Sequence, residues 1–367
     1  MKWSDNMRHL ATVRTITDIR PIPDADKIEV AQVDGWECVV AKADGFKVGD
    51  KVVYIEIDSI VPERPEFEFL RDRKFRVRTI KLRKQVSQGL VLPLSILPSG
   101  KTYDINDDVT EILGIKKYDP QAEQEAKLLE NNTYKTKIWY PKFLMRFKWF
   151  RNLIIKPKKG NFPSWIVKTD EERIQNKTAM FNIEKENGTK FIVTEKIDGQ
   201  SGTYFLERIG KKKYEFGVCS RNIRLSKPND SSYWTIAKQF EIEKCLKSLI
   251  GDYNRIVLQG EIIGTGIQGN KYKVDGYDFY AFNLIIDGKK INTVEMTNFL
   301  TLYGIKSVPI VEENMELKES VQDMVEYSKG KSVLLPSQKR EGVVIRNYER
   351  NISFKVINPD FLLAEKD

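Results

Sequence analysis

The first hundred residues alternate short runs of apolar and polar positions with turn residues. Strand-like runs rich in β-branched and aromatic side chains occupy residues 27–33, 37–43, 51–57 and 75–81. They are separated by the turn-forming stretches DGW, ADG and VGD, which are typical breaks between strands. About five short strands in such a span predict a small β-barrel.

The second half of the chain shows a different pattern. Strand-like runs at 190–195, 255–261 and 277–286 are joined by irregular stretches, and one helical pattern lies near 232–249. The strands do not alternate regularly with helices as in βαβ units, so we expect an α+β domain of antiparallel sheets with flanking helices.

The 367 residues are too many for one core, which seldom exceeds about 250 to 300 residues. We expect an N-terminal OB-like domain over 1–116, a linker over 117–160 and a C-terminal domain over 161–367. The linker sequence YPKFLMRFKWFRNLIIKPKKG mixes basic and aromatic residues. It fits an amphipathic helix packed between the domains or a segment that tracks a nucleic-acid backbone.

Charge and composition narrow the classes of function. The 61 Lys and Arg against 52 Asp and Glu give a net charge of +9 and a pI near 9.1, which favours a polyanionic partner. His9 is the one histidine of the chain, so Ser/His/Asp and Cys/His catalysis are disfavoured. Three scattered cysteines fit reduced thiols. The chain lacks a membrane-length apolar run and a signal peptide, so we expect a soluble, intracellular protein.

The candidate chemistry centres on Lys196, which is followed by Ile197, Asp198 and Gly199 directly after the run FIVTE. This tetrapeptide is common by chance and usually means a strand ending in a turn. Its significance comes from the motifs that follow it in order: Ser220-Arg221-Asn222, Gly260-Glu261, Tyr280-Ala281-Phe282-Asn283, Glu341-Gly342-Val343-Val344-Ile345-Arg346 and Ser353-Phe354-Lys355.

A lysine attacks a phosphate only as the neutral amine, although its ordinary pKa is about 10.4. A nearby divalent cation disfavours the ammonium form and requires oxygen ligands or carboxylates that hold its waters. Asp198, Glu261 and Glu341 are the candidates. Each lies beside a glycine, which permits close approach of backbone or nucleotide.

These motifs resemble the covalent nucleotidyltransferase superfamily of ATP-dependent DNA and RNA ligases and GTP-dependent mRNA capping enzymes. The resemblance spans residues 196–355, and the upstream FPSWIVKTDEERIQN resembles the beginning of an RNA ligase domain. The resemblance implies that Lys196 forms a lysyl-AMP. It also implies that residues of the motifs given above bind the nucleotide and its Mg²⁺ or Mn²⁺.

The resemblance also implies individual roles. Asp198 would bind the ribose or a hydrated metal, and Arg221 the ribose or the nick phosphate, while Glu261 and Glu341 would orient the metal. Phe282 would stack on adenine, unless it is a core aromatic, and Lys355 would stabilise the α-phosphate, unless it is a solvated lysine. Glu195 and Gly199 complete the predicted nucleotide-binding set. Many relatives have a second lysine where this chain has Ile357, which puts one phosphate contact in doubt.

Domain order distinguishes among these enzymes. The stretches IPDADKIEVAQV and KVGDKVVYIEIDSIVP resemble the OB-fold RNA-binding module of some aminoacyl-tRNA synthetases. The basic run at 71–84 would supply phosphate contacts or form a solvated hairpin. Residues 356–367 are too few for a C-terminal OB domain, so the order resembles RNA ligases with an OB domain in front.

We therefore expect a monomeric, ATP-dependent RNA ligase that seals 3′-OH and 5′-phosphate ends. Three alternatives stay open at this point: a DNA ligase, a GTP-dependent capping-type guanylyltransferase and a non-catalytic RNA-binding protein.

Overall fold

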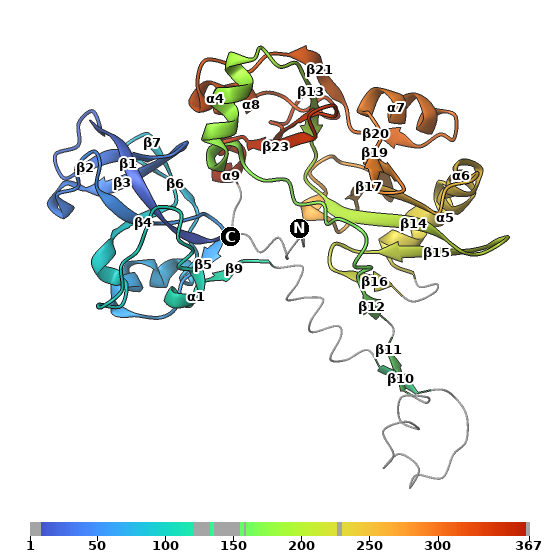
Figure 1. The fold of residues 1–367 in the computed structure, drawn as a ribbon, viewed down its shortest axis with the longest axis horizontal. Coiled ribbons are helices and arrows are strands. Elements are labelled where there is room, and N and C mark those ends of the chain that lie inside the picture. Colours follow the sequence, from blue (N-terminus) through green and yellow to red (C-terminus); the bar gives the residue numbers. More distant parts are fainter. Residues whose placement is uncertain (1–8, 120–132, 136–154, 158, 226–229, 365–367) are drawn as a thin grey trace, which may run out of the picture.

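The computed structural model describes residues 9–119, 133–135, 155–157, 159–225 and 230–364. These residues form two domains, drawn in blue to cyan and in green to red (Figure 1). Most of the predicted linker at 117–160 lies outside the described residues, so its two interpretations remain predictions.

The N-terminal domain is built on a five-stranded antiparallel sheet in the order β3-β2-β1-β4-β8. Burial alternates along β3, where Trp36, Cys38 and Val40 enter the core between more exposed neighbours, as the two-residue period of a strand requires. The curled sheet confirms the predicted OB-like barrel. Its strands are β1 (Ala11–Pro21), β2 (Ile28–Val33), β3 (Trp36–Ala41), β4 (Lys51–Ile55) and β8 (Leu90–Pro93).

Short elements complete this domain. The strand predicted at 75–81 was wrong in its first part, because Lys74 and Phe75 have φ of 51° and 57°, a left-handed backbone that interrupts a strand. The elements are β5 (Ser59–Ile60) paired with β9 (Lys116–Lys117), the hairpin of β6 (Thr79–Leu82) and β7 (Gln85–Gln88), the 3₁₀ turns η1 (Lys42–Asp44), η2 (Pro65–Arg73) and η3 (Leu94–Ile96), and α1 (Thr110–Leu113).

The C-terminal domain contains two sheets. The larger has the order β12-β16-β15-β14-β17-β18-β19, with β20 parallel to β18, and the smaller has the order β21-β13-β22-β23. The described residues also include the pair β10 (Thr133–Lys135) and β11 (Ile155–Pro157).

The larger sheet consists of β12 (Lys159–Asn161), β16 (Ile223–Leu225), β15 (Lys213–Cys219), β14 (Gln200–Gly210), β17 (Arg255–Gly264), β18 (Tyr277–Ile286), β19 (Lys289–Lys290) and β20 (Lys306–Ser307). The smaller sheet consists of β21 (Ile310–Met315), β13 (Phe191–Lys196), β22 (Gly342–Asn347) and β23 (Ile352–Ile357). The strands predicted at 190–195, 255–261 and 277–286 thus correspond to β13, β17 and β18.

Helices flank both sheets, as predicted for an α+β domain. The larger sheet shares its core with α5 (Ser232–Gln239), α6 (Ile242–Leu249) and α7 (Thr293–Thr301), and the smaller with α4 (Thr178–Glu186) and α8 (Val321–Ser328). The remaining elements are η5 (Ile174–Asn176), η6 (Gln268–Asn270) and α9 (Pro359–Ala364).

The helical stretch predicted at 232–249 is broken in two, because Glu241 has a left-handed backbone with φ of 45°. Among the described residues, no helix has both the length and the apolar character needed to cross a membrane.

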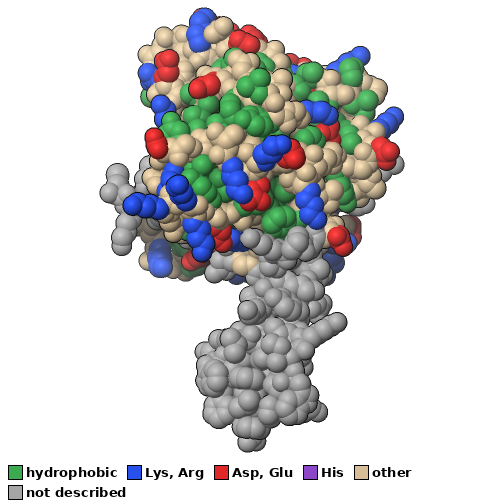
Figure 2. Space-filling model, turned by 90° about the vertical axis from the view of Figure 1, so that its right-hand side faces the viewer, with side chains coloured by type: hydrophobic (Ala, Val, Ile, Leu, Met, Phe, Trp, Pro, Cys, Tyr) green, Lys and Arg blue, Asp and Glu red, His purple; other side chains and the backbone are tan. Residues whose placement is uncertain are grey.

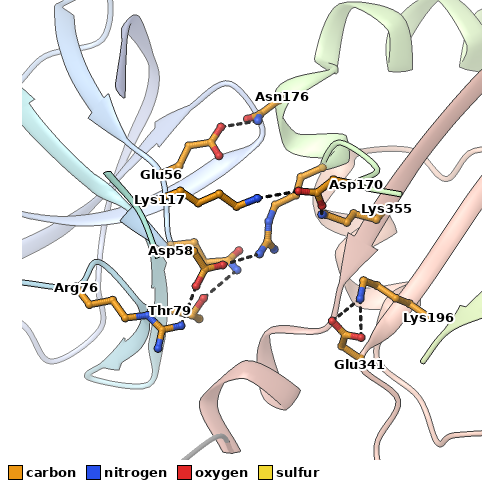
Figure 3. A network of polar contacts seen from close by, with 12 residues as sticks. Glu56, Asp58, Arg76, Thr79, Lys117, Asp170, Asn176, Lys196, Glu341 and Lys355 are labelled. Atoms are coloured by element: carbon orange, nitrogen blue, oxygen red, sulfur yellow. Dashed lines mark hydrogen bonds and ion pairs between the residues drawn. The ribbon is translucent and has the colours of Figure 1, made fainter. Parts of the chain in front are cut away.

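Buried polar contacts join the two domains. The Trp36 indole donates to Asn176 Oδ1 at 2.6 Å, and Asn176 Nδ2 donates to Glu56 Oε1 at 2.6 Å (Figure 3). The Gly35 amide donates to the Gln175 carbonyl at 3.2 Å. A Cβ at Gly35 would lie 2.8 Å from Gln175 Cα, so this close approach requires glycine.

Charged side chains lie both on the outer surface and between the domains. On the face of the C-terminal domain shown in Figure 2, basic and acidic side chains are interspersed among apolar ones. The cleft between the domains is lined by basic and acidic side chains, with Lys and Arg slightly more numerous than Asp and Glu.

Candidate active site

The tetrapeptide that begins with Lys196 crosses from one sheet to the other. Lys196 ends β13 in the smaller sheet, and Gln200 begins β14 in the larger one. Strand register places Lys196 opposite Gly342 and therefore beside Glu341. On the other side, β14 pairs with β17, which carries Glu261. Antiparallel pairing thus brings together residues far apart in the sequence.

The glycines beside the three carboxylates are required by packing. A Cβ at Gly199, Gly260 or Gly342 would lie 2.4, 2.6 or 2.2 Å from a backbone carbonyl oxygen. Any side chain at these positions would push neighbouring strands apart. The expectation that each glycine permits a close approach of backbone is confirmed.

Lys196 forms a partly buried ion pair with Glu341. Its Nζ lies 2.6 and 2.7 Å from the two carboxylate oxygens (Figure 3). Burial lowers the pKa of Lys196, but the charges of Glu341, Glu261 and Asp198 outweigh burial and raise it. This contact therefore stabilises the ammonium form of Lys196.

The other two carboxylates have different surroundings. Burial raises the pKa of Glu261 to about 8, with a further increase from nearby Glu341, and Glu261 accepts a hydrogen bond from the Gly199 amide at 3.1 Å. Asp198 pairs with Lys271 at 2.5 Å. Within the described ranges, no three acidic, His or Cys side chains are close enough to bind one metal ion together. The carboxylates could hold a cation only through its waters or after rearrangement.

A second ionic cluster lies beside Lys196. Asp170 accepts from Lys117 and Lys355 at 2.9 Å and from Arg221 at 3.0 Å. Burial opposes ionisation of Asp170, yet these three cations hold its pKa well below the usual range. Burial lowers the pKa of Lys355 to about 8, with additional repulsion from Arg173. Lys355 is therefore no ordinary solvated strand lysine.

Two further predicted residues, Phe282 and Glu195, line the cleft. Phe282, on β18, is partly buried and lines the cleft. Glu195 is buried at the end of β13, and one of its oxygens, Oε2, accepts from the Val333 amide at 2.7 Å. Its Oε1 is buried without a hydrogen-bond partner in the part of the chain that the structure describes.

All predicted site residues line one cleft of about 1240 Å³ between the domains. One side, the catalytic wall, belongs to the C-terminal domain and includes Glu195, Lys196, Asp198, Gly199, Arg221, Glu261, Phe282, Glu341 and Lys355. The opposite side comes from the N-terminal domain. Its cations, called the basic wall, are Arg73, Lys74, Arg76, Arg78 and Lys117, and they lie beside Asp58, Asp72 and Asp119.

Several residues at this site were missed by the sequence reasoning. Asp170 lies in the stretch that resembles the beginning of an RNA ligase domain, and Lys271 lies in the loop that follows β17. Lys117 carries no motif. Ile357, which replaces a lysine of many relatives, also lines the cleft.

Comparison with known proteins identifies the family. A model of the RNA ligase family matches residues 189–357, and one of an OB-fold domain matches residues 10–94. A mutant of Naegleria gruberi RNA ligase, solved with ATP and Mn, is 33% identical with a TM-score of 0.79. The match covers 97% of this chain and 99% of that chain. This chain belongs to the RNA ligase family.

Two further structures of the Naegleria gruberi RNA ligase are similar to this chain. A mutant with ATP and Mn is 34% identical, with a TM-score of 0.79, and covers 98% of this chain and 100% of its own. A structure with PPi is 34% identical, with a TM-score of 0.77, and covers 97% and 98%. The comparison with curated proteins gave no match.

Proposed function

We propose that this ligase uses ATP to seal 3′-OH and 5′-phosphate RNA ends, including nicks, through a lysyl-AMP intermediate on Lys196. The convergence of Lys196, three carboxylates and the cations Arg221 and Lys355 in one cleft carries the proposal. The ATP and Mn in the Naegleria gruberi structures support ATP and a divalent cation as the cofactors here.

The reaction has three steps. Lys196 Nζ attacks the α-phosphorus of ATP, forming an N–P bond while diphosphate leaves. An oxygen of the RNA 5′-phosphate then attacks the same phosphorus, which transfers AMP and releases the lysine. Finally the 3′-OH attacks the activated 5′-phosphate, forming the phosphodiester and releasing AMP.

The side chains around Lys196 suit these steps. Arg221 and Lys355 already share one anionic partner, the Asp170 carboxylate, so both can be directed at one phosphate. Preorganised positive charge of this kind stabilises developing negative charge in phosphoryl transfer. We assign these two residues to the α-phosphate and the 5′-phosphate.

Asp198, Glu261 and Glu341 provide the hard oxygen donors that Mg²⁺ and Mn²⁺ prefer. Burial raises the pKa of Glu261 to about 8, and the charges of Glu341 and Asp198 raise it further. A divalent cation bound there would supply the charge that favours the neutral amine of Lys196.

Base recognition follows from Phe282 and Glu195. We assign Phe282 to stacking on the base. The unpartnered Glu195 Oε1 suits the exocyclic amine of adenine, whereas guanine presents a carbonyl oxygen at the corresponding ring position. Placing the guanine carbonyl oxygen against the Glu195 carboxylate would bring two hydrogen-bond acceptors together in a buried site, which is costly. We therefore expect ATP to be preferred over GTP.

Sealing assays test the proposed substrate. A nicked duplex with RNA at the 3′-OH end should be sealed with ATP and Mg²⁺ or Mn²⁺, and GTP should not replace ATP. The matched substrate carries deoxyribose at the nick. Equal sealing of the all-DNA nick, or equal use of GTP, would contradict the proposal.

A further inference from the structure

The loop that follows β17, residues 265–274, folds over the tetrapeptide that begins with Lys196. The Tyr272 hydroxyl accepts from the Asp198 amide at 3.0 Å, and Gln268 Nε2 donates to the Gly199 carbonyl at 3.4 Å. Gln268 and Asn270 both have positive φ, 46° and 48°, in the left-handed region that non-glycine residues seldom adopt. The loop thus keeps a strained backbone while it holds Asp198.

Lys271 of this loop makes the closest side-chain contact to Asp198. Its Nζ lies 2.5 Å from Asp198 Oδ2, and the two side chains are 26% and 13% exposed. The same Nζ lies 4.4 Å from the centre of the Phe361 ring, within the range of a cation–π contact. Lys271 is therefore fixed between a carboxylate and an aromatic face.

Phe361 is itself held by the packing of α9 between the domains. Phe361 is buried, and the next residue, Leu362, packs against the core of the N-terminal domain. A chain of direct contacts therefore runs from that core through α9 to Lys271 and Asp198. This support makes the ion pair part of a rigid site rather than a surface contact.

We infer that Lys271 is a positioning residue for adenylylation, an inference that rests on the proposed function. Lys271 binds Oδ2 of Asp198 and leaves Oδ1, which has no hydrogen bond among the described contacts, for the ATP ribose or a cation-bound water. Lys271 acts through Asp198, because its ammonium is already engaged by that carboxylate and the Phe361 ring.

The inference makes a prediction about paired substitutions. Lys271→Met should slow single-turnover adenylylation by about tenfold, the size expected when a charge-assisted hydrogen bond is lost. Lys271→Arg should recover most of that rate, since it keeps the charge. When Lys271→Met is added to Asp198→Asn, the adenylylation rate should fall by less than a further factor of about two. The effects of two residues that act together are not additive. Lys273→Met, at an exposed position of the same loop, is the control and should match wild type.

Binding and stability measurements separate positioning from folding. In a Lys196→Met background, where the lysyl-AMP bond cannot form, Lys271→Met should weaken ATP binding by about threefold or more. The midpoint of thermal unfolding should change by no more than about 3 °C. A larger loss of stability together with failure of Lys271→Arg to restore the rate would assign Lys271 a structural role and overturn the inference.

The outcomes also distinguish this inference from the proposed function. If wild type labels with ATP but Lys271→Met labels at the wild-type rate, the inference fails alone. It also fails if the losses caused by Lys271→Met and Asp198→Asn multiply. If wild type does not label, the proposed function fails first.

Discussion

The catalytic wall and the basic wall of the cleft differ in both backbone and charge. The catalytic wall carries Lys196 and its carboxylates on paired strands or directly beside them, and register and closely packed glycines fix their positions. Four cations of the basic wall lie at and beyond the end of η2 on largely irregular backbone, and the fifth, Lys117, ends the short strand β9. The first arrangement suits bond making at a fixed atom, and the second suits binding of phosphates at variable positions.

The largest effect should come from Glu341→Gln on the catalytic wall. If Glu341 only stabilised the ammonium form of Lys196, removing its charge would lower the pKa of the lysine and speed adenylylation. We expect instead a loss on the order of 100-fold in the adenylylation rate, because Glu341 is one of the oxygen donors assigned to the divalent cation. Single-turnover labelling measures this, and an equal or faster rate would contradict the account.

A smaller effect should come from the basic wall. The double change Arg73→Ala with Arg78→Ala should weaken binding of nicked RNA by about tenfold and reduce the salt dependence of binding. Lys47→Ala with Lys101→Ala removes the same charge at exposed positions outside the cleft and should change binding by less than about twofold. Equal losses in both pairs would show that only net charge matters.

The pH dependence of sealing tests Lys355. Burial gives its ammonium a pKa of about 8, so the charge is present below that pH and lost as the pH rises through it. The rate of the step that needs this charge should be about fourfold lower at pH 8.5 than at pH values well below 8. In Lys355→Arg the guanidinium stays charged, and the alkaline decline should move to higher pH. An unchanged decline would assign it to another group.

The smallest effect on activity should come from the contact between the domains. Asn176→Ala leaves the Trp36 indole and the Glu56 carboxylate without this partner, which should cost about 1 to 3 kcal/mol of stability. The adenylylation rate below the unfolding transition should stay within about twofold. Asn254→Ala, at an exposed position, is the control, and equal unfolding curves would show that the contact contributes nothing.

The sequence predicted the catalytic wall better than the rest of the cleft. The motif residues around Lys196 are short stretches of fixed chemistry on strands with a clear pattern, so both their identity and their strands were predictable. Asp170 and Lys271 escaped because their importance depends on partners distant in the sequence. The backbone breaks at Phe75 and Glu241 were also missed, because the local sequence pattern favours a regular element at positions where the structure has positive φ.

The central claim is that Lys196 becomes covalently bound to AMP. The direct measurement is incubation with ATP labelled at the α-phosphate and Mg²⁺ or Mn²⁺, followed by a denaturing gel, for wild type, Lys196→Arg and the exposed control Lys238→Arg. The account predicts label on wild type and Lys238→Arg, none on Lys196→Arg, and release of the label as AMP when nicked RNA is added. An unlabelled wild type, or label that survives in Lys196→Arg, would contradict it.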